Sequence, residues 1–481
     1  MYSDRTRCRR KAGTRYGQRI RSAGHAEPEC ATSRCRDVRA EFDDFDGSES
    51  DRLSRLIGDA PFQRVGKREC DEQQDDVHGR ELSYRLAAMN WLGDWANLLL
   101  RWTHFIAGIA WIGSSFYFIW LDRTLTAPPM PRPGVEGDLW MVHSGGFYQV
   151  EKRRPAPGEV PPILHWFKWE AMLTWITGIS LLVLVYYLSD AYLLDPSTAR
   201  IGRGTAMALG IGLLVLGWLI YDWLWRTALA RQPGVAGAIS LALLAGVTVL
   251  LCRLFSGRAA YMHVGSLLGT IMVANVWMRI LPAQQQMLDA TRAGRPADFT
   301  LGERAKQRSV HNSYITFPLL FIMLSNHYPA TYASSANWLI LLLLFVAGGA
   351  VRHAMIGHER SKRLALVPAA FALAAAIFLA TPKGAAAPAS VSTSVPAFVT
   401  VRSVITQRCQ PCHSQYQSDR ALGPAPGGVT FDTPESIARF AQRINVRAVE
   451  TKTMPPANKT AITAEERELL GRWIAGGAPL R

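Results

Sequence analysis

The sequence predicts an all-α protein in which an eight-helix transmembrane bundle is followed by a small helical domain. Two observations lead to this fold class. Hydrophobic residues make up 49% of the chain and gather in separate runs of about 20 residues, the length that crosses the hydrocarbon core of a bilayer. After the last run, a tract rich in alanine, proline, serine and threonine leads into a more polar segment, which is typical of a linker and a second domain.

The eight expected spans are separated by more polar connections. They lie at about 97–121, 170–194, 205–225, 235–255, 259–281, 311–331, 336–356 and 364–381. In the long first connection, the segments 139–143 and 147–150 flank a Ser-Gly-Gly turn sequence, which predicts a β-hairpin. The bundle is therefore expected to carry one ordered connection at the end of its first helix.

The tract before the first span differs in composition from the rest of the chain. Residues 1–88 are rich in arginine and aspartate, show no apolar periodicity and contain no signal-peptide pattern. We expect them to be disordered or to lie ahead of the natural start, for which Met89 is a better candidate. The remaining divisions are then a membrane domain over 89–381, a linker over 382–395 and a C-terminal domain over 396–481.

The distribution of positive charge predicts the orientation of the spans. Lysine and arginine are more frequent in the first, third, fifth and seventh connections than in the connections between them. Because positively charged connections stay in the cytoplasm, both ends of an eight-span chain would lie on the external side. The net charge of +15 is therefore first a topology signal, and no basic stripe with interleaved aromatic residues indicates nucleic-acid binding.

The C-terminal domain carries the most specific motif of the chain. Cys409 and Cys412, with His413 directly after them, have the C-x-x-C-H spacing with which two thiols attach a haem c and the histidine binds its iron. Met454, in a proline-stiffened loop, is the expected second axial ligand. Half of a zinc site is the competing interpretation, but zinc requires four ligands and no second Cys or His pair lies nearby. The sequence thus predicts a covalent haem c whose iron has both axial positions filled.

The flanks of this motif fit a small cytochrome c domain. Residues 395–408 are predicted to form its first helix, because Phe398, Val401, Val404 and Ile405 recur at near-helical spacing. A last helix is expected to open at Thr463, whose spacing to Glu466 is that of a capping box, and to continue through Trp473.

Five histidines fall inside the expected spans, where ionisable side chains are costly and by default indicate function. Counted from the span ends, the polar residues form two layers. The external layer consists of Arg101, His104, His263, Asn326 and His327. The cytoplasmic layer consists of His311 and His353 with Asp122, Glu170, Asp222, Arg279, Asn312 and Arg352. Helix-packing contacts are the plainer interpretation of any one histidine, and two histidines on different helices could also hold a haem b.

Five segments of the membrane domain, together with the haem motif, resemble the bacterial membrane-bound urate hydroxylases, in which a multi-span domain is fused to a C-terminal cytochrome c. These segments are WIGSSFYF at 111–118, GFYQV at 146–150, HWFKWE at 165–170, HNSY at 311–314 and SNHYP at 325–329. The resemblance covers about 89–481, and the tract before Met89 departs from it.

The resemblance implies oxidation of urate to 5-hydroxyisourate, with electrons leaving through the haem c to a downstream cytochrome c or terminal oxidase. It also implies a bacterial inner membrane with the cytochrome domain on the periplasmic side. By proximity to the haem, we expect the urate site among Arg101, His104, His263, Asn326 and His327. Histidine supplies a base near neutral pH, and arginine can hold the urate anion.

Two other functions fit the same sequence. The chain could be a membrane-anchored electron carrier between a quinol or partner dehydrogenase and a terminal oxidase. It could also be a quinol oxidoreductase that contains a haem b held by paired histidines. Reduction of the haem by added urate favours urate chemistry, whereas reduction by quinol alone favours either alternative.

Overall fold

The computed structural model describes residues 61–161, 163–188, 193–195, 200–356, 359–381, 395–419, 425 and 428–481. Residues 1–60 of the tract predicted to be disordered over 1–88, and residues 382–394 of the linker predicted over 382–395, lie outside this part of the chain. The chain divides into two units between Met89 and Asn90.

The first helix, α3 (Pro61–Thr124), is longer than expected. Residues 61–88 form its N-terminal part, which differs from the prediction that they lack regular structure. Pro61 stands at the first helical position, where a missing N–H costs nothing. The residues after it are mostly good helix formers, and extending a helix costs far less than nucleating one.

The part of the chain that the structure describes is mostly helical, and six of its helices are long and apolar enough to cross a membrane. The spanning stretch of α3 is Trp95–Thr124. The other five are α4 (Trp169–Leu182) continued by the π-turn η1 (Val183–Tyr187), α5 (Arg203–Leu224), α6 (Pro233–Leu254), α7 (Gly257–Asn275) continued by the π-turn η3 (Val276–Ile280) and α8 (Leu281–Arg292), and α11 (Asn337–Ile356). These six agree with six of the predicted spans.

The other two predicted spans are helical but less apolar. The helix α9 (Phe299–Ser325) begins well before the predicted span at 311–331, because Asp298 caps it by accepting a hydrogen bond from the Thr300 N–H at 2.9 Å. Its early turns carry several charged side chains. The apolar part of α12 (Glu359–Ala380) is the shorter stretch Leu364–Ala380. The eight-span count therefore stays a prediction.

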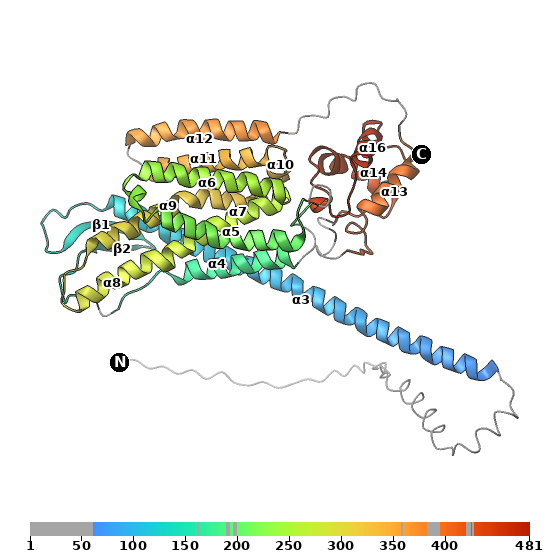
Figure 1. The fold of residues 1–481 in the computed structure, drawn as a ribbon, viewed down its shortest axis with the longest axis horizontal. Coiled ribbons are helices and arrows are strands. Elements are labelled where there is room, and N and C mark those ends of the chain that lie inside the picture. The colour runs from blue at the N-terminus through green and yellow to red at the C-terminus, as the bar shows by residue number, and fades with distance from the viewer. Residues whose placement is uncertain are drawn as a thin grey trace, which may run out of the picture. The chain divides into compact units, whose positions relative to one another are not determined.

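Helix α7 occupies the centre of the bundle, where α4, α5, α6 and α9 all pack against it (Figure 1). Half of the residues in its spanning window are buried, against 11–33% in the other five spans. Small residues permit this close packing. At Gly265, for example, a Cβ atom would lie only 2.7 Å from the side chain of Ile322. Helix α7 is thus held in place by four neighbouring helices.

A β-hairpin follows α3, as predicted. Strand β1 (Val135–His143) pairs antiparallel with β2 (Gly146–Arg153). Ser144 and Gly145 form the two-residue turn, and both have positive φ values (49° and 77°), as the primed hairpin turns require. The hairpin lies at one end of the bundle, whereas α10 (Pro329–Tyr332) and the C-terminal end of α12 lie at the other (Figure 1).

The C-terminal region forms a small helical fold with its own core. Its elements are α13 (Phe398–Arg408), α14 (Pro434–Arg439), α15 (Ala441–Ile444), η5 (Asn445–Glu450), η6 (Pro456–Asn458) and α16 (Ala464–Ala475). The four apolar residues predicted for the first helix are all buried, together with Leu470 and Trp473. The predicted capping box is present: the Thr463 hydroxyl accepts from the Glu466 N–H at 3.2 Å, and the Glu466 carboxylate accepts from the Thr463 N–H at 2.8 Å.

An ion cluster ties three elements together at the hairpin end of the bundle. The carboxylate of Asp222 on α5 is buried and accepts hydrogen bonds from Arg279 of η3 (2.7 Å from Nε) and from Arg308 of α9 (3.1 Å). Arg308 also stacks over the Tyr221 ring at 4.9 Å. A buried carboxylate between two guanidinium groups is costly to leave half-paired, so the three elements are held in one arrangement.

We expect Asp222→Ala to destabilise the bundle by roughly 3–5 kcal/mol, because it leaves two guanidinium groups beside an empty position. Arg226→Ala is the matched control. Arg226 also approaches Asp222, at 3.8 Å, but its side chain is 65% exposed, so its loss should cost under about 1 kcal/mol. Thermal unfolding of the detergent-solubilised protein measures both variants. Equal stability of the two would contradict a structural role for the cluster.

Candidate functional site

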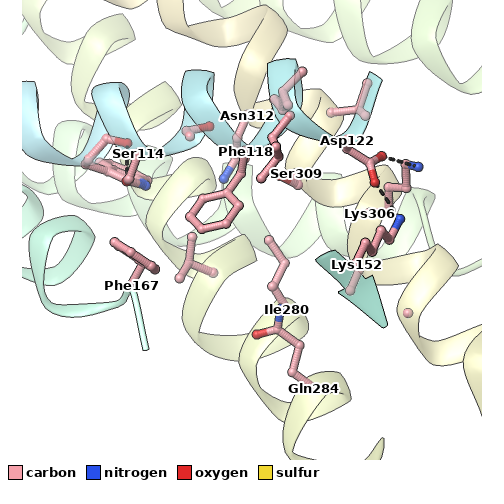
Figure 2. Close-up of a pocket in the computed structure, with 18 of the residues that line it drawn as sticks. Ser114, Phe118, Asp122, Lys152, Phe167, Ile280, Gln284, Lys306, Ser309 and Asn312 are labelled. Atoms are coloured by element: carbon pink, nitrogen blue, oxygen red, sulfur yellow. Dashed lines mark hydrogen bonds and ion pairs between the residues drawn. The ribbon is translucent and has the colours of Figure 1, made fainter. Parts of the chain in front are cut away.

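A cavity of about 740 Å³ opens between α3, the hairpin, α8 and α9 (Figure 2). The side of α3 from Trp111 to Arg123 forms one wall, and Asn312 and Ser309 of α9 contribute to another. The π-turn η3 supplies Val276 and Ile280. Because a π-turn shifts the side chains after it around the helix axis, it redirects this wall of the cavity, and such turns are frequent at functional sites.

Four of the five motif segments that carry the resemblance meet in this cavity, although they are far apart in the sequence. The segment 111–118 contributes five lining residues, and 165–170 contributes three. The segments 146–150 and 311–314 contribute Val150 and Asn312. The fifth segment, 325–329, contributes none. The fold therefore gathers most of the motif residues around one space.

Charged side chains join three elements at the rim of the cavity. The Asp122 carboxylate on α3 binds the ammonium groups of Lys152 on β2, at 2.5 Å, and of Lys306 on α9, at 2.7 Å (Figure 2). The hydrogen bond that Lys152 donates to Asp122 raises the pKa of Lys152 above its usual range, so this ammonium stays charged. Arg123 and Glu151 also line the cavity. Three cations against two carboxylates favour an anionic ligand.

Aromatic rings line the middle of the cavity. Phe118 of α3 points into the space and meets Phe167 edge-on, with ring centroids 5.2 Å apart (Figure 2). His165 packs against Phe167 at 4.6 Å. The segment is anchored by Lys168, whose ammonium lies within 5.8 Å of three tryptophan rings. Flat aromatic surfaces beside a histidine suit a planar heterocycle.

Asn312 is held in one orientation by α7. Its Nδ2 donates to the Met272 carbonyl at 2.9 Å, and its Oδ1 accepts from Asn275 Nδ2 at 3.0 Å. Asn275 also donates to the hydroxyl of Tyr221 at 3.2 Å, and this hydroxyl is 2.7 Å from Nδ1 of His311. A buried network thus runs from the cavity wall to the first of the cytoplasmic-layer histidines.

The predicted external-layer residues do not line this cavity or the second cavity of about 540 Å³ that adjoins it at Lys152 and Lys306. Arg101 donates to Asn97 at 2.6 Å on its own helix. His104 donates through Nδ1 to the Thr174 carbonyl at 2.9 Å. The assignment of the external-layer residues to a urate site stays a prediction.

The other external-layer residues lie where α7 and α9 meet. His263 is buried, donates through Nδ1 to the Ala259 carbonyl at 2.8 Å and accepts at Nε2 from Tyr187 at 2.9 Å. Asn326 accepts from Arg258 Nε at 2.9 Å, which places it one helical turn from His263. The side chain of His327 is exposed. None of the hydrogen bonds found among the described residues joins two of the five predicted side chains directly.

The haem motif occupies a turn that follows α13. Cys409 and Cys412 are free thiols rather than a disulfide. Nδ1 of His413 donates to the Val429 carbonyl at 2.9 Å, so the proton lies on Nδ1 and the Nε2 lone pair is left for a metal. Among the residues that the structure describes, no group of three His, Cys, Asp or Glu side chains could hold a metal ion. This donor set suits a haem iron better than zinc.

The loop that carries Met454 is fixed by its backbone. The Met454 N–H donates to the Arg447 carbonyl at 2.9 Å, and the Met454 carbonyl accepts from Arg467 of α16 at 2.8 Å. The Arg467 side chain is buried and also donates to Asn458 at 3.1 Å. The ring of His413 and the backbone of Met454, the two predicted axial ligands, are therefore each held by hydrogen bonds of their own.

The cavity was not singled out by the sequence, because its lining comes from many elements that are far apart in the chain. A signal was nevertheless available in the motif segments themselves. They carry the resemblance, and four of the five line the cavity. The urate site was instead predicted in the external layer, because this layer was expected to lie near the haem.

The long apolar helices define a helical protein consistent with a membrane location. The family described as urate oxidase N-terminal matches residues 90–382. This match covers more than half of the chain, so the chain belongs to the urate oxidase N-terminal family, and this membership indicates an oxidoreductase with urate-related chemistry. Comparisons with curated proteins and with solved structures find no match.

Proposed function

We propose that this protein oxidises urate to 5-hydroxyisourate in the motif-lined cavity and passes the electrons to a haem c in its C-terminal domain. The observation that carries the proposal is the convergence of four motif segments on one cavity that offers aromatic faces, amide groups and an excess of cations. Urate is a planar, electron-rich purine anion, and these are the groups that would recognise it.

The reaction balances without dioxygen. Urate and one water give 5-hydroxyisourate, two protons and two electrons, so the added oxygen comes from water. The protein must then bind the anion, accept protons and remove electrons one at a time. No flavin is required at the substrate, because the acceptor is attached to the same chain.

The lining residues take separate roles in this scheme. Phe118 and Phe167 would offer their free faces and edges to the purine ring, while Asn312 and Gln284 would present amide groups to its carbonyl and N–H edges. His165 is the histidine of the lining and would act as the base that takes a proton from urate or from the attacking water.

The C-terminal residues fit the electron acceptor. Cys409 and Cys412 would attach the haem through thioether bonds, and His413 and Met454 would bind its iron. Once bound, the haem would supply one-electron acceptance at a raised potential, so the two electrons of each urate leave in succession. A soluble cytochrome c or a terminal oxidase on the periplasmic side of a bacterial inner membrane would receive them.

The external layer is the second candidate location for the same reaction. His327 lies just before α10, at the end of the bundle remote from the hairpin, and His104 lies on α3 on the N-terminal side of the residues that line the cavity. A site there would shorten the electron path, whereas the cavity offers the enclosed space and the charge that the anion needs.

The first prediction of this proposed function concerns the haem. Denaturing gels should retain haem staining, because thioether bonds survive unfolding, and Met454→Ala should keep the stain but lower the reduction potential. Redox titration of the purified protein measures the shift. Extraction of the haem by acidified acetone would show that it is not covalently held.

The second prediction concerns the substrate and its location. Urate should reduce the haem under anaerobic conditions without forming hydrogen peroxide, as followed by visible spectroscopy. His165→Ala should slow this reduction by roughly 100-fold or more, because a general base is lost. A small chemical reductant should still reduce the haem of every variant.

His104→Ala and His327→Ala form the comparison set for this experiment. Retained reduction by urate in both would place the chemistry in the cavity. Their selective failure, with normal reduction in His165→Ala, would move the site to the external layer. A wild-type protein whose haem is reduced by quinol and not by urate would refute the urate chemistry itself.

A further inference from the structure

Arg352 of α11 is a buried cation for which the described residues provide no carboxylate. Its side chain is only 2% exposed, and its Nε donates to the Ser313 hydroxyl at 2.6 Å. Its guanidinium carbon lies 3.8 Å from the centroid of the Phe116 ring. Its Nη2 has no hydrogen-bond partner, and no carboxylate of the described residues is within ion-pair distance.

This lack of pairing contrasts with the other arginine buried in the bundle. Arg308, which is 5% exposed, shares the carboxylate of Asp222 with Arg279. A buried charge without a partner is costly, and inside a membrane span it indicates function by default. Stacking on Phe116 and the nearby C-terminal end of α11 offset part of this cost, but neither provides a hydrogen-bond acceptor for Nη2.

Arg352 lies directly behind the cavity. Its two contacts, Phe116 and Ser313, each directly follow a lining residue. These lining residues are Ser115 and Asn312. Ile356, one turn further along α11, is itself a lining residue. The guanidinium group therefore contacts α3 and α9, which are two of the elements that form the cavity walls.

We propose that Arg352 is the counter-charge of the bound substrate, so that the cavity selects anionic over neutral purines. This inference rests on the proposed function and adds the residue that recognises the anion. From its place behind the lining, the guanidinium group would act on the anion through its charge, which low-dielectric surroundings screen only weakly. The rim lysines cannot take this role as readily, because both already share Asp122.

The test compares Arg352→Met and Arg352→Lys in the full-length haem protein, with Arg308→Met as the matched control. Arg352→Met should raise KM for urate by roughly 10- to 100-fold, the size of one lost charge interaction, with a smaller change in kcat. Arg352→Lys should lie between this variant and the wild type. Arg308→Met should lose thermal stability and should raise KM less than Arg352→Met does, because Arg308 already shares a carboxylate.

A binding measurement separates recognition from folding. Urate should raise the Tm of the wild-type and Arg308→Met proteins more than hypoxanthine, a neutral purine, does. In Arg352→Met this preference for the anion should disappear. If Arg352→Met does not accumulate, the KM and the anion preference of Arg352→Lys decide the question.

Wild-type KM and anion preference in Arg352→Met would overturn the proposal, as would an equal rise of KM in Arg308→Met. Failure of the proposed function gives a different result, since wild-type protein would then show neither haem reduction by urate nor stabilisation by it. That outcome would refute both the proposed oxidation of urate and the proposed role of Arg352.

Discussion

The arrangement of the bundle depends on the carboxylate of Asp222 between the guanidinium groups of Arg279 and Arg308. This contact connects α5, η3 and α9 at the end of the bundle where the hairpin lies. Two of these elements, η3 and α9, are also walls of the cavity. In a low-dielectric interior, such a cluster has one satisfactory geometry, because moving any partner exposes a charge that nothing else neutralises. The cavity walls are thus positioned by an interaction that lies outside the cavity.

The cations at this end of the bundle differ in whether they have a carboxylate partner. Asp222 shares its one carboxylate between Arg279 and Arg308, and Asp122 shares its carboxylate between the two rim lysines. Arg352 is left without a carboxylate among the described residues, and Arg123 adds an exposed cation at the mouth. In this described part of the bundle, cations therefore outnumber the carboxylates that face them. An anion in the cavity would offset part of this excess.

Local features were predictable from the sequence because neighbouring residues determine them. The capping box at Thr463, the hairpin turn at Ser144 and the buried face of α13 all follow from short-range patterns and were confirmed. The C-x-x-C-H spacing is local in the same way, although the haem that it predicts stays a prediction. Boundaries set by caps were harder to assign, since Asp298 starts α9 well before its apolar part.

The candidate site was less predictable because it depends on contacts between distant segments. Periodicity places Asn312 and Ser114 on their helices, but it does not show that both face the same space as His165. Nor does it reveal the π-turn η3, in which helical composition continues unchanged while the side-chain direction shifts. The sequence therefore identified several cavity residues as parts of motifs, but it did not show that these motifs line one cavity.

The depth of the cavity bears on how electrons could leave it. The lining of α3 runs from Asp122 to Trp111, which is roughly 16 Å at 1.5 Å per residue and about half of a hydrocarbon core of ~30 Å. Phe116, beside Arg352, lies between these limits. The chain continues to the haem motif from Ala380, at the end of α12 remote from the hairpin. An anion held near Phe116 and Arg352 would therefore lie about 9 Å below Asp122, so roughly a third of the hydrocarbon core would already be crossed by the substrate itself.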